Sequence, residues 1–261
     1  MLHEQPAAGV VPAASPETDI RIAGLRKGFN GHGILNGVNL EIKHGQSVAL
    51  IGANGTGKST LLRCCLRLID ADGGTVQLLG RDITGLNRRA LRRVRAQIGM
   101  VFQRHNLVPR LKVLTNVIHG AQSRRAGPTV WLHSLAAETT RREAMRCLEM
   151  VGLNKLADRR ADQLSGGQSQ RVAIARALMQ HPKIMLADEP VASLDPSAGE
   201  EVMSLFVELI RREGLTLFFT SHNLDHAVTY AERVVGLRSG VIELDEPSDR
   251  VDPVSLKDIY E

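Results

Sequence analysis

The polar residues best suited to chemistry form a glycine-rich run that ends in lysine, serine and threonine. The run matches the phosphate-binding pattern G-x-x-x-x-G-K-[ST] and consists of Gly52, Ala53, Asn54, Gly55, Thr56, Gly57, Lys58, Ser59 and Thr60. Its glycines let backbone N–H groups face the phosphates, and a following helix directs its positive end at them. Lys58 would add charge for the β- and γ-phosphates, and Ser59 would offer a hydroxyl to Mg²⁺. The alternative is a glycine turn that only joins a strand to a helix.

Two adjacent carboxylates, Asp188 and Glu189, follow the apolar run 184–187. At the end of a buried strand, Asp188 could hold Mg²⁺ directly or through water, and Glu189 could orient or deprotonate an attacking water. The alternative is that the two acids simply begin a loop before Pro190. Four apolar residues leading into Asp-Glu-Pro favour the paired role.

A third stretch, Leu164-Ser165-Gly166-Gly167-Gln168, lies between these two motifs. Ser-x-x-Gln is a capping box, so the stretch predicts a helix start. Two glycines and a serine at a helix start also form an anion site, displaced from the first. As a bare pentapeptide the stretch favours the structural interpretation, but its position as a second, displaced anion site changes those odds. One chain does not readily need two γ-phosphate sites for one nucleotide, so the residues alone leave the function of this site open.

The hydrophobic pattern predicts the elements that must position these motifs. Short apolar runs over 20–50 indicate antiparallel strands, and the last of them, 47–51, leads into the glycine loop. Apolar residues at one-face helical spacing follow the loop. The later elements are expected as a strand-like run at 98–102, strands at 184–187 and 215–220, and helices near 197–213 and 223–232. This alternation predicts a parallel sheet.

The segment 104–180 is expected to be a helical insertion in that sheet, with a loop over 120–134. The predicted fold class is therefore α/β, with a mainly parallel sheet core, an antiparallel β subdomain and an inserted α-helical subdomain. Residues 1–18 are expected to be a flexible extension that does not resemble a secretory signal, and 19–261 to be one domain.

Composition excludes several classes of protein. Of the 261 residues, 43% are hydrophobic and 23% are charged, and no apolar run approaches the roughly 20 residues that cross a bilayer. Three cysteines are too few and too ill-spaced for a metal site or a disulfide framework. The net charge of +5 and the arginines of 88–95 could attract polyanions, but aromatic residues are only 3%. We therefore expect no nucleic-acid partner.

The order of the glycine loop, the Ser165 segment and the Asp-Glu pair resembles that of the ATPase subunits of ABC transporters. The resemblance implies a P-loop NTPase fold of the ABC type, ATP and Mg²⁺ as ligands, and Glu189 as the catalytic carboxylate. It also implies a head-to-tail homodimer, in which the signature segment of one chain reaches the ATP of the other. The residues expected in that contact are Ser165, Gly166, Gly167, Gln168 and Asp195.

The same resemblance assigns three further positions. Gln103 corresponds to the Q-loop and would approach Mg²⁺ or water, although a glutamine at a strand end is usually polar surface. His222 follows the strand 215–220 and corresponds to the switch histidine that contacts the γ-phosphate. Phe29 lies where an aromatic residue stacks on adenine, although such a residue is more often part of a core. Asp195 precedes Pro196 and is also a plain helix cap.

Several longer stretches, at 102–111, 113–117, around Trp131 and at 186–196, are similar to those of phosphonate importers. This resemblance implies coupling of ATP hydrolysis to uptake of phosphonate or a related phosphorus oxyanion. It also implies integral membrane permease partners, an extracytoplasmic solute-binding protein, and a peripheral place at the cytoplasmic face of the inner membrane. Ser169 and Ser221-His222-Asn223 depart from the phosphonate pattern.

Alternatives at this stage are an importer ATPase for another small solute and a cassette subunit associated with carbon–phosphorus lyase. A DNA-repair or chromosome-organising relative would need a long coiled coil between Lys58 and Asp188, for which the chain has no room. A translation-associated relative would normally carry two cassettes, and only one is present.

Overall fold

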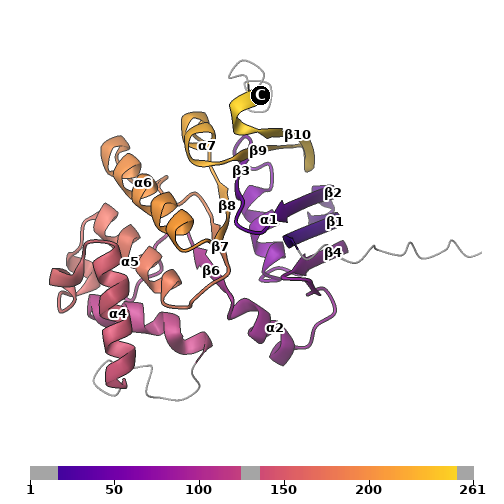
Figure 1. Cartoon of the computed structure of the whole chain (residues 1–261). Coiled ribbons are helices and arrows are strands. Elements are labelled where there is room, and N and C mark those ends of the chain that lie inside the picture. Colours follow the sequence, from indigo (N-terminus) through magenta and orange to yellow (C-terminus); the bar gives the residue numbers. More distant parts are fainter. Residues whose placement is uncertain (1–16, 125–135, 252–261) are drawn as a thin grey trace, which may run out of the picture.

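The larger sheet has six strands in the order β10-β9-β3-β8-β7-β6 (Figure 1). The computed structural model describes residues 17–124 and 136–251. Strands β9, β3, β8, β7 and β6 run parallel to one another, and only β10 is antiparallel to its neighbour. The strands are β3 (Ser47–Ile51), β6 (Ile98–Val101), β7 (Ile184–Ala187), β8 (Thr216–Thr220), β9 (Arg233–Arg238) and β10 (Val241–Pro247). The parallel order brings the carboxyl ends of β3, β8, β7 and β6 to one edge of the sheet.

The smaller sheet has four strands in the order β2-β1-β4-β5, all antiparallel. Its strands are β1 (Thr18–Phe29), β2 (His32–Lys43), β4 (Gly73–Leu78) and β5 (Arg81–Asp82). Because β1 begins at Thr18, the last residue assigned to the expected N-terminal extension belongs to the sheet. Residues 1–16 lie outside the described part of the chain.

Two hydrophobic cores cover the two faces of the larger sheet. In β8, Phe218 packs with residues of α1 and β1, whereas its neighbours Leu217 and Phe219 pack with residues of α5 and α6. Side chains alternate in this way because successive residues of a strand point to opposite faces. Figure 1 shows the result, with α5 and α6 on one side of the sheet and α1 with the smaller sheet on the other.

The helices connect the strands in the expected alternation. They are α1 (Lys58–Cys65), α2 (Arg88–Arg95), α3 (Val113–Ile118), α4 (Glu138–Met150), α5 (Gly166–Leu178), α6 (Pro196–Arg212) and α7 (Leu224–Tyr230). Short 3-10 turns cover His119–Ser123, Asn154–Leu156, Ala161–Gln163 and Ser248–Arg250. No helix in the described ranges is long and apolar enough to cross a membrane.

The helical insertion lies between β6 and β7 and contains α3, α4 and α5. The expected loop over 120–134 is wrong at its start, because His119–Ser123 continues from α3 as a 3-10 helix. Its backbone is held there by packing, and Ala121 is fully buried. The rest of that loop, including Trp131, lies outside the described residues.

Part of the arginine cluster has a structural use. Arg95, the last residue of α2, donates from Nε to the Leu66 carbonyl (2.7 Å) and from a terminal nitrogen to the Arg67 carbonyl (2.5 Å). These carbonyls lie where α1 ends, and helix ends leave carbonyl groups that need donors. Arg95 therefore joins α2 to the end of the helix that follows the glycine loop.

Candidate functional site

The glycine loop joins β3 to α1, as the sequence predicts. Gly57 caps α1 with a left-handed backbone (φ 105°), and a Cβ there would lie 2.9 Å from Ile34 Cγ2. A Cβ on Gly52 would lie only 2.3 Å from the Leu237 carbonyl oxygen. Both positions therefore require glycine, which allows the backbone to turn closely in front of the helix. The loop is tightened by Thr56, whose hydroxyl donates to the Ala53 carbonyl (2.9 Å).

Lys58 is buried at the start of α1, with a relative exposure of 5%. Its Nζ donates to the carbonyls of Gly52 (2.8 Å) and Ala53 (3.0 Å) and lies 3.9 Å from Glu189 Oε1. Burial lowers the pKa of Lys58, and the charges of Glu189 and Asp188 oppose that shift. The ammonium group is thus held between the loop and the two carboxylates, where it could meet phosphate oxygens.

Asp188 follows β7 directly and is only 4% exposed. Its Oδ1 accepts hydrogen bonds from the Ser59 hydroxyl (2.8 Å) and the Thr220 hydroxyl (3.0 Å). A serine hydroxyl next to a buried carboxylate is a donor set that suits Mg²⁺, which prefers oxygen ligands together with substrate phosphates. The residues present therefore fit the expected metal, and Ser59 and Asp188 are the groups that would hold it.

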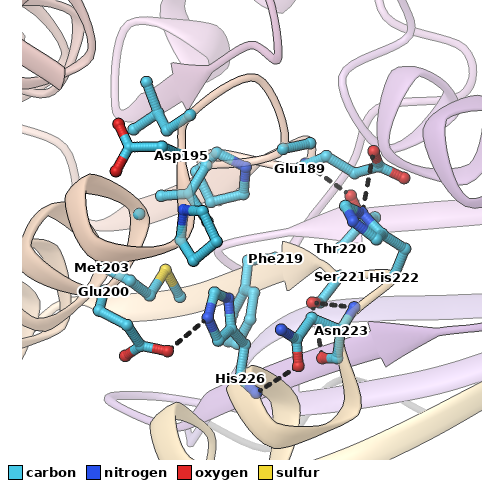
Figure 2. A pocket seen from close by; sticks show the side chains of 16 residues that line it. Glu189, Asp195, Glu200, Met203, Phe219, Thr220, Ser221, His222, Asn223 and His226 are labelled. Atoms are coloured by element: carbon cyan, nitrogen blue, oxygen red, sulfur yellow. Dashed lines mark hydrogen bonds and ion pairs between the residues drawn. The ribbon is translucent and has the colours of Figure 1, made fainter. Parts of the chain in front are cut away.

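Glu189 has an unusual backbone for a glutamate. Its φ is 46°, in the left-handed region that costs about 1–2 kcal/mol for a residue with a side chain. The Glu189 N–H donates to the Thr220 hydroxyl (2.8 Å), and its Oε2 lies 3.5 Å from His222 Nδ1 (Figure 2). The carboxylate therefore lies between Lys58 on one side and His222 on the other.

Thr220 is the residue of this site that the sequence reasoning missed. It is the last residue of β8 and is fully buried, and its hydroxyl donates to Asp188 while accepting from the Glu189 N–H. One hydroxyl thus holds both members of the Asp-Glu pair. The available signal was a polar residue at the end of an otherwise apolar strand, next to His222.

Gln103 and Phe29 lie at the edges of this arrangement. Gln103 comes shortly after β6, and Asp188 comes directly after β7. These two strands are neighbours in the sheet, because Val101 of β6 pairs with Ala187 of β7. Its side chain is exposed. Phe29 ends β1 with 45% of its surface exposed, and Lys27 Nζ lies 5.2 Å from the ring centroid. An exposed ring of this kind could stack on a base, which is the role that the resemblance implies.

The signature segment forms a complete capping box at the start of α5. The Ser165 hydroxyl accepts from the Gln168 N–H (3.3 Å), and the Gln168 side chain accepts from the Ser165 N–H (3.1 Å). Asp195 likewise caps α6 by accepting from the Ala198 N–H (3.0 Å), with Pro196 at the first turn. Both cap interpretations of the sequence are therefore confirmed.

The two capped helix starts lie against each other. A Cβ on Gly166 would lie 3.0 Å from Leu194 Cδ2, and residues of both starts line one surface hollow. That hollow is lined by residues of the segments 152–156, 165–171, 193–195 and 198–202. No residue of the glycine loop 52–60 lines this hollow.

The strand order and these contacts define the class of protein, a P-loop nucleotide hydrolase with a helical insertion that contains a capped helix start. A family model described as ABC transporter matches residues 35–192. The chain is 46% identical over 242 residues to the phosphonates import ATP-binding protein of Synechococcus sp., covering 92% of this chain and 90% of the relative. For the phosphonates import ATP-binding protein of Alcaligenes faecalis the identity is 43%, covering 92% and 87%.

Solved structures show the same class. The dimeric structure of a bacterial ABC transporter cassette matches with a TM-score of 0.78 and 35% identity, over 88% of this chain and 98% of that chain. The same cassette in a post-hydrolysis state bound to ADP and Pi matches with a TM-score of 0.78 and 34% identity, over 88% of this chain and 98% of that chain.

The chain belongs to the ABC transporter family, as one of its ATP-binding, ATP-hydrolysing cassettes. The predicted fold class is confirmed.

Proposed function

We propose that this cassette hydrolyses ATP to drive uptake of phosphonate or a related phosphorus oxyanion. The observation that carries the proposal is the 46% identity, over 92% of this chain, to a relative named for phosphonate import. The chain's own residues argue only for a nucleotide site. The cargo would therefore be recognised by an integral membrane permease and by an extracytoplasmic solute-binding protein.

In the proposed reaction, the loop 52–60 binds the ATP phosphates through its N–H groups and Lys58. Mg²⁺ held by Ser59 and Asp188, with Gln103 close by, would neutralise charge on the β- and γ-phosphate oxygens. Glu189 orients the attacking water and accepts its proton, because its carboxylate is held between Lys58 and His222. His222 then contacts the γ-phosphate from the opposite side of that carboxylate.

The second chain of the proposed homodimer completes each site. We propose that the signature segment does not serve the glycine loop of its own chain, since the hollow that it lines includes no residue of 52–60. We infer that Ser165, Gly166, Gly167, Gln168 and Asp195 reach ATP held by the partner chain. Capped helix starts suit this role, since their free N–H groups and the helix dipole attract anions.

A permease partner places the cassette on the cytoplasmic face of the membrane as a peripheral subunit. The segment after Gln103 is the surface we propose for that contact. Val108 in this segment is 44% exposed, as a docking surface requires, whereas Val113 is fully buried and serves only the core of the insertion.

Uptake of radiolabelled phosphonate into vesicles that contain the full complex tests the proposal. With Glu189→Gln, ATP binding should persist while uptake falls by at least about a hundredfold, because the proton acceptor of the hydrolysis step is lost. A matched control is Glu208→Gln, the same change on an exposed position of α6. Undiminished uptake by Glu189→Gln would contradict the mechanism.

Purification of the native complex separates the cargo alternatives. Co-purification with a membrane permease supports transport, and co-purification with soluble lyase subunits contradicts it. If the permease is present but phosphonate fails to compete with other solutes for uptake, the ATPase assignment stands and the phosphonate assignment is wrong.

A further inference from the structure

One carboxylate ties two helices of the site together. Glu200 on α6 accepts a hydrogen bond from Tyr230 Oη at Oε2 (2.7 Å), and its Oε1 lies 2.8 Å from His226 Nε2. His226 and Tyr230 are one turn apart on α7, and their rings meet edge to face with centroids 5.7 Å apart. Figure 2 shows the Glu200 carboxylate pointing at the His226 ring. Both oxygens of the carboxylate are thus engaged by α7.

The contact joins a Glu200 side chain that is 56% exposed to two aromatic side chains of α7. His226 is only 13% exposed, and the aromatic partners have few rotatable bonds to fix. Burial and the hydrogen bond to Glu200 raise the pKa of Tyr230 to about 12. Hydrogen bonds from Tyr230 and His226 hold the pKa of Glu200 below its ordinary value. Glu200 and Tyr230 therefore favour the protonation states that keep their contact, and we name Glu200, His226 and Tyr230 the α6–α7 clamp.

Helix α6 begins at the loop that contains Asp195, and α7 begins at the loop that contains His222. Asp195, the cap of α6, belongs to the loop proposed to contact the partner chain. Asn223, the cap of α7, follows His222 directly and accepts from the His226 N–H (3.2 Å). His226 therefore contacts the start of α7 through its backbone and α6 through its ring.

Two clamp residues, Glu200 and His226, line one cavity together with residues of the two loops. Its volume is about 200 Å³, and its lining includes Glu189, Asp195, Glu200, His222 and His226. The cavity lies between the starts of α6 and α7, so a shift of one helix against the other would move the residues of both loops that line it.

We propose that the α6–α7 clamp holds His222 beside Glu189 and couples its position to that of the Asp195 loop, which is proposed to contact the partner chain. The inference rests on the proposed dimeric mechanism. Glu200, His226 and Tyr230 are positioning residues, because they act through His222 and not on the nucleotide. The simpler alternative is that the clamp only adds stability by joining two helices.

Steady-state ATP hydrolysis by the full complex tests the clamp, with Tyr230→Phe and Glu200→Gln as the variants. Tyr230→Phe keeps the ring and removes one hydrogen bond, and Glu200→Gln keeps the size and removes the charge. We expect kcat to fall about fivefold in each, the scale of coupling through a packed network. KM for ATP should stay within about twofold, because the glycine loop is untouched.

Glu208→Gln is the control, since it makes the same chemical change on the same helix away from α7. Urea unfolding of each variant measures stability separately. An unchanged kcat, with or without a loss of stability, would leave the clamp a purely structural contact and overturn the proposal.

A double-mutant cycle identifies the loop through which the clamp acts. Asp195→Asn keeps a good helix cap while changing the group offered to the partner. In the Asp195→Asn background, Tyr230→Phe should change kcat by less than about twofold, because the coupling between the Asp195 loop and His222 is already lost. The same fivefold loss in both backgrounds would overturn the proposal. The readout is ATP turnover, so a failure of phosphonate uptake would be recognised separately.

Discussion

The Asp-Glu pair is held by a hydroxyl from another strand. Thr220 bonds to the Asp188 carboxylate and to the Glu189 N–H, and it is fully buried. A group that contacts both carboxylate-bearing residues fixes the metal site and the water site relative to each other. The precision of the site therefore depends on a residue that has no chemical role of its own.

Replacing Thr220 by valine should lower both stability and turnover. Valine has the same shape, but it leaves the Asp188 oxygen and the Glu189 N–H without that partner, which costs about 1–3 kcal/mol. Urea unfolding measures the loss, and ATP hydrolysis measured well below the unfolding transition reports the effect on the site. Thr220→Ser should recover most of both. If Thr220→Val unfolds like the wild type, the hydroxyl does not hold the pair in solution.

The sequence predicted Lys58, Ser59, Asp188 and Glu189 because their motifs are short and local. Thr220 could not be found in that way. Its contact depends on the pairing of β7 with β8, in which Ala187 lies opposite Phe219, and such pairing joins residues that are far apart in the chain. Local patterns identify which residues do chemistry, whereas the long-range register decides which residues hold them.

Helix starts were also predictable from the sequence, because the motifs that cap them are short and local. The caps at Ser165 and Asp195 are bonds between a side chain and the N–H three residues later, so the sequence contains every group involved. The 3-10 helix at His119–Ser123 was not predictable, since buried neighbours and not local residues hold it. Gly120 shows this, because a Cβ there would lie 2.1 Å from the Arg176 carbonyl of α5.

Variants of Ser165 can separate its structural use from its functional use. Ser165→Ala removes the cap and should cost about 1 kcal/mol, whereas Ser165→Asp keeps a good cap and most of the stability. Turnover should follow the opposite order, with Ser165→Asp the least active, because its charge repels the partner's phosphates. Urea unfolding gives the order of stability, and ATPase assays on the same preparations give the order of turnover.

If turnover instead follows stability across the series, Ser165 is only a cap. The signature segment would then have no direct part in the nucleotide site, and the proposed contact with the partner chain would have to come from other residues.

At the scale of the whole molecule, one chain presents two incomplete sites. The glycine loop, the Asp-Glu pair and His222 lie at the carboxyl edge of the larger sheet, and the signature segment lines a separate hollow. Asp195 lines both that hollow and the cavity beside Glu189 and His222. The strand order that creates this division was not available from the sequence, which predicted a parallel sheet without its order. The dimer follows from the division as a proposal.

Mixing two inactive chains should restore activity if the dimer is head to tail. Lys58→Ala disables the glycine loop and Ser165→Asp disables the signature segment, so each homodimer has no intact site. A heterodimer has one site in which both halves are intact. ATP hydrolysis should therefore appear on mixing and reach a measurable fraction of the wild-type rate. Mixtures that stay inactive, although light scattering shows that heterodimers form, would contradict composite sites.

The left-handed backbone at Glu189 has a consequence for how such cassettes decay over evolutionary time. Glycine adopts that conformation freely, so replacing Glu189 by glycine would relax the backbone while removing the proton acceptor. Selection for folding stability alone thus favours glycine over glutamate at this position, and only selection for ATP hydrolysis keeps the glutamate. Copies of this chain released from that demand should lose Glu189 early, and they should persist as well-folded proteins that bind nucleotide without consuming it.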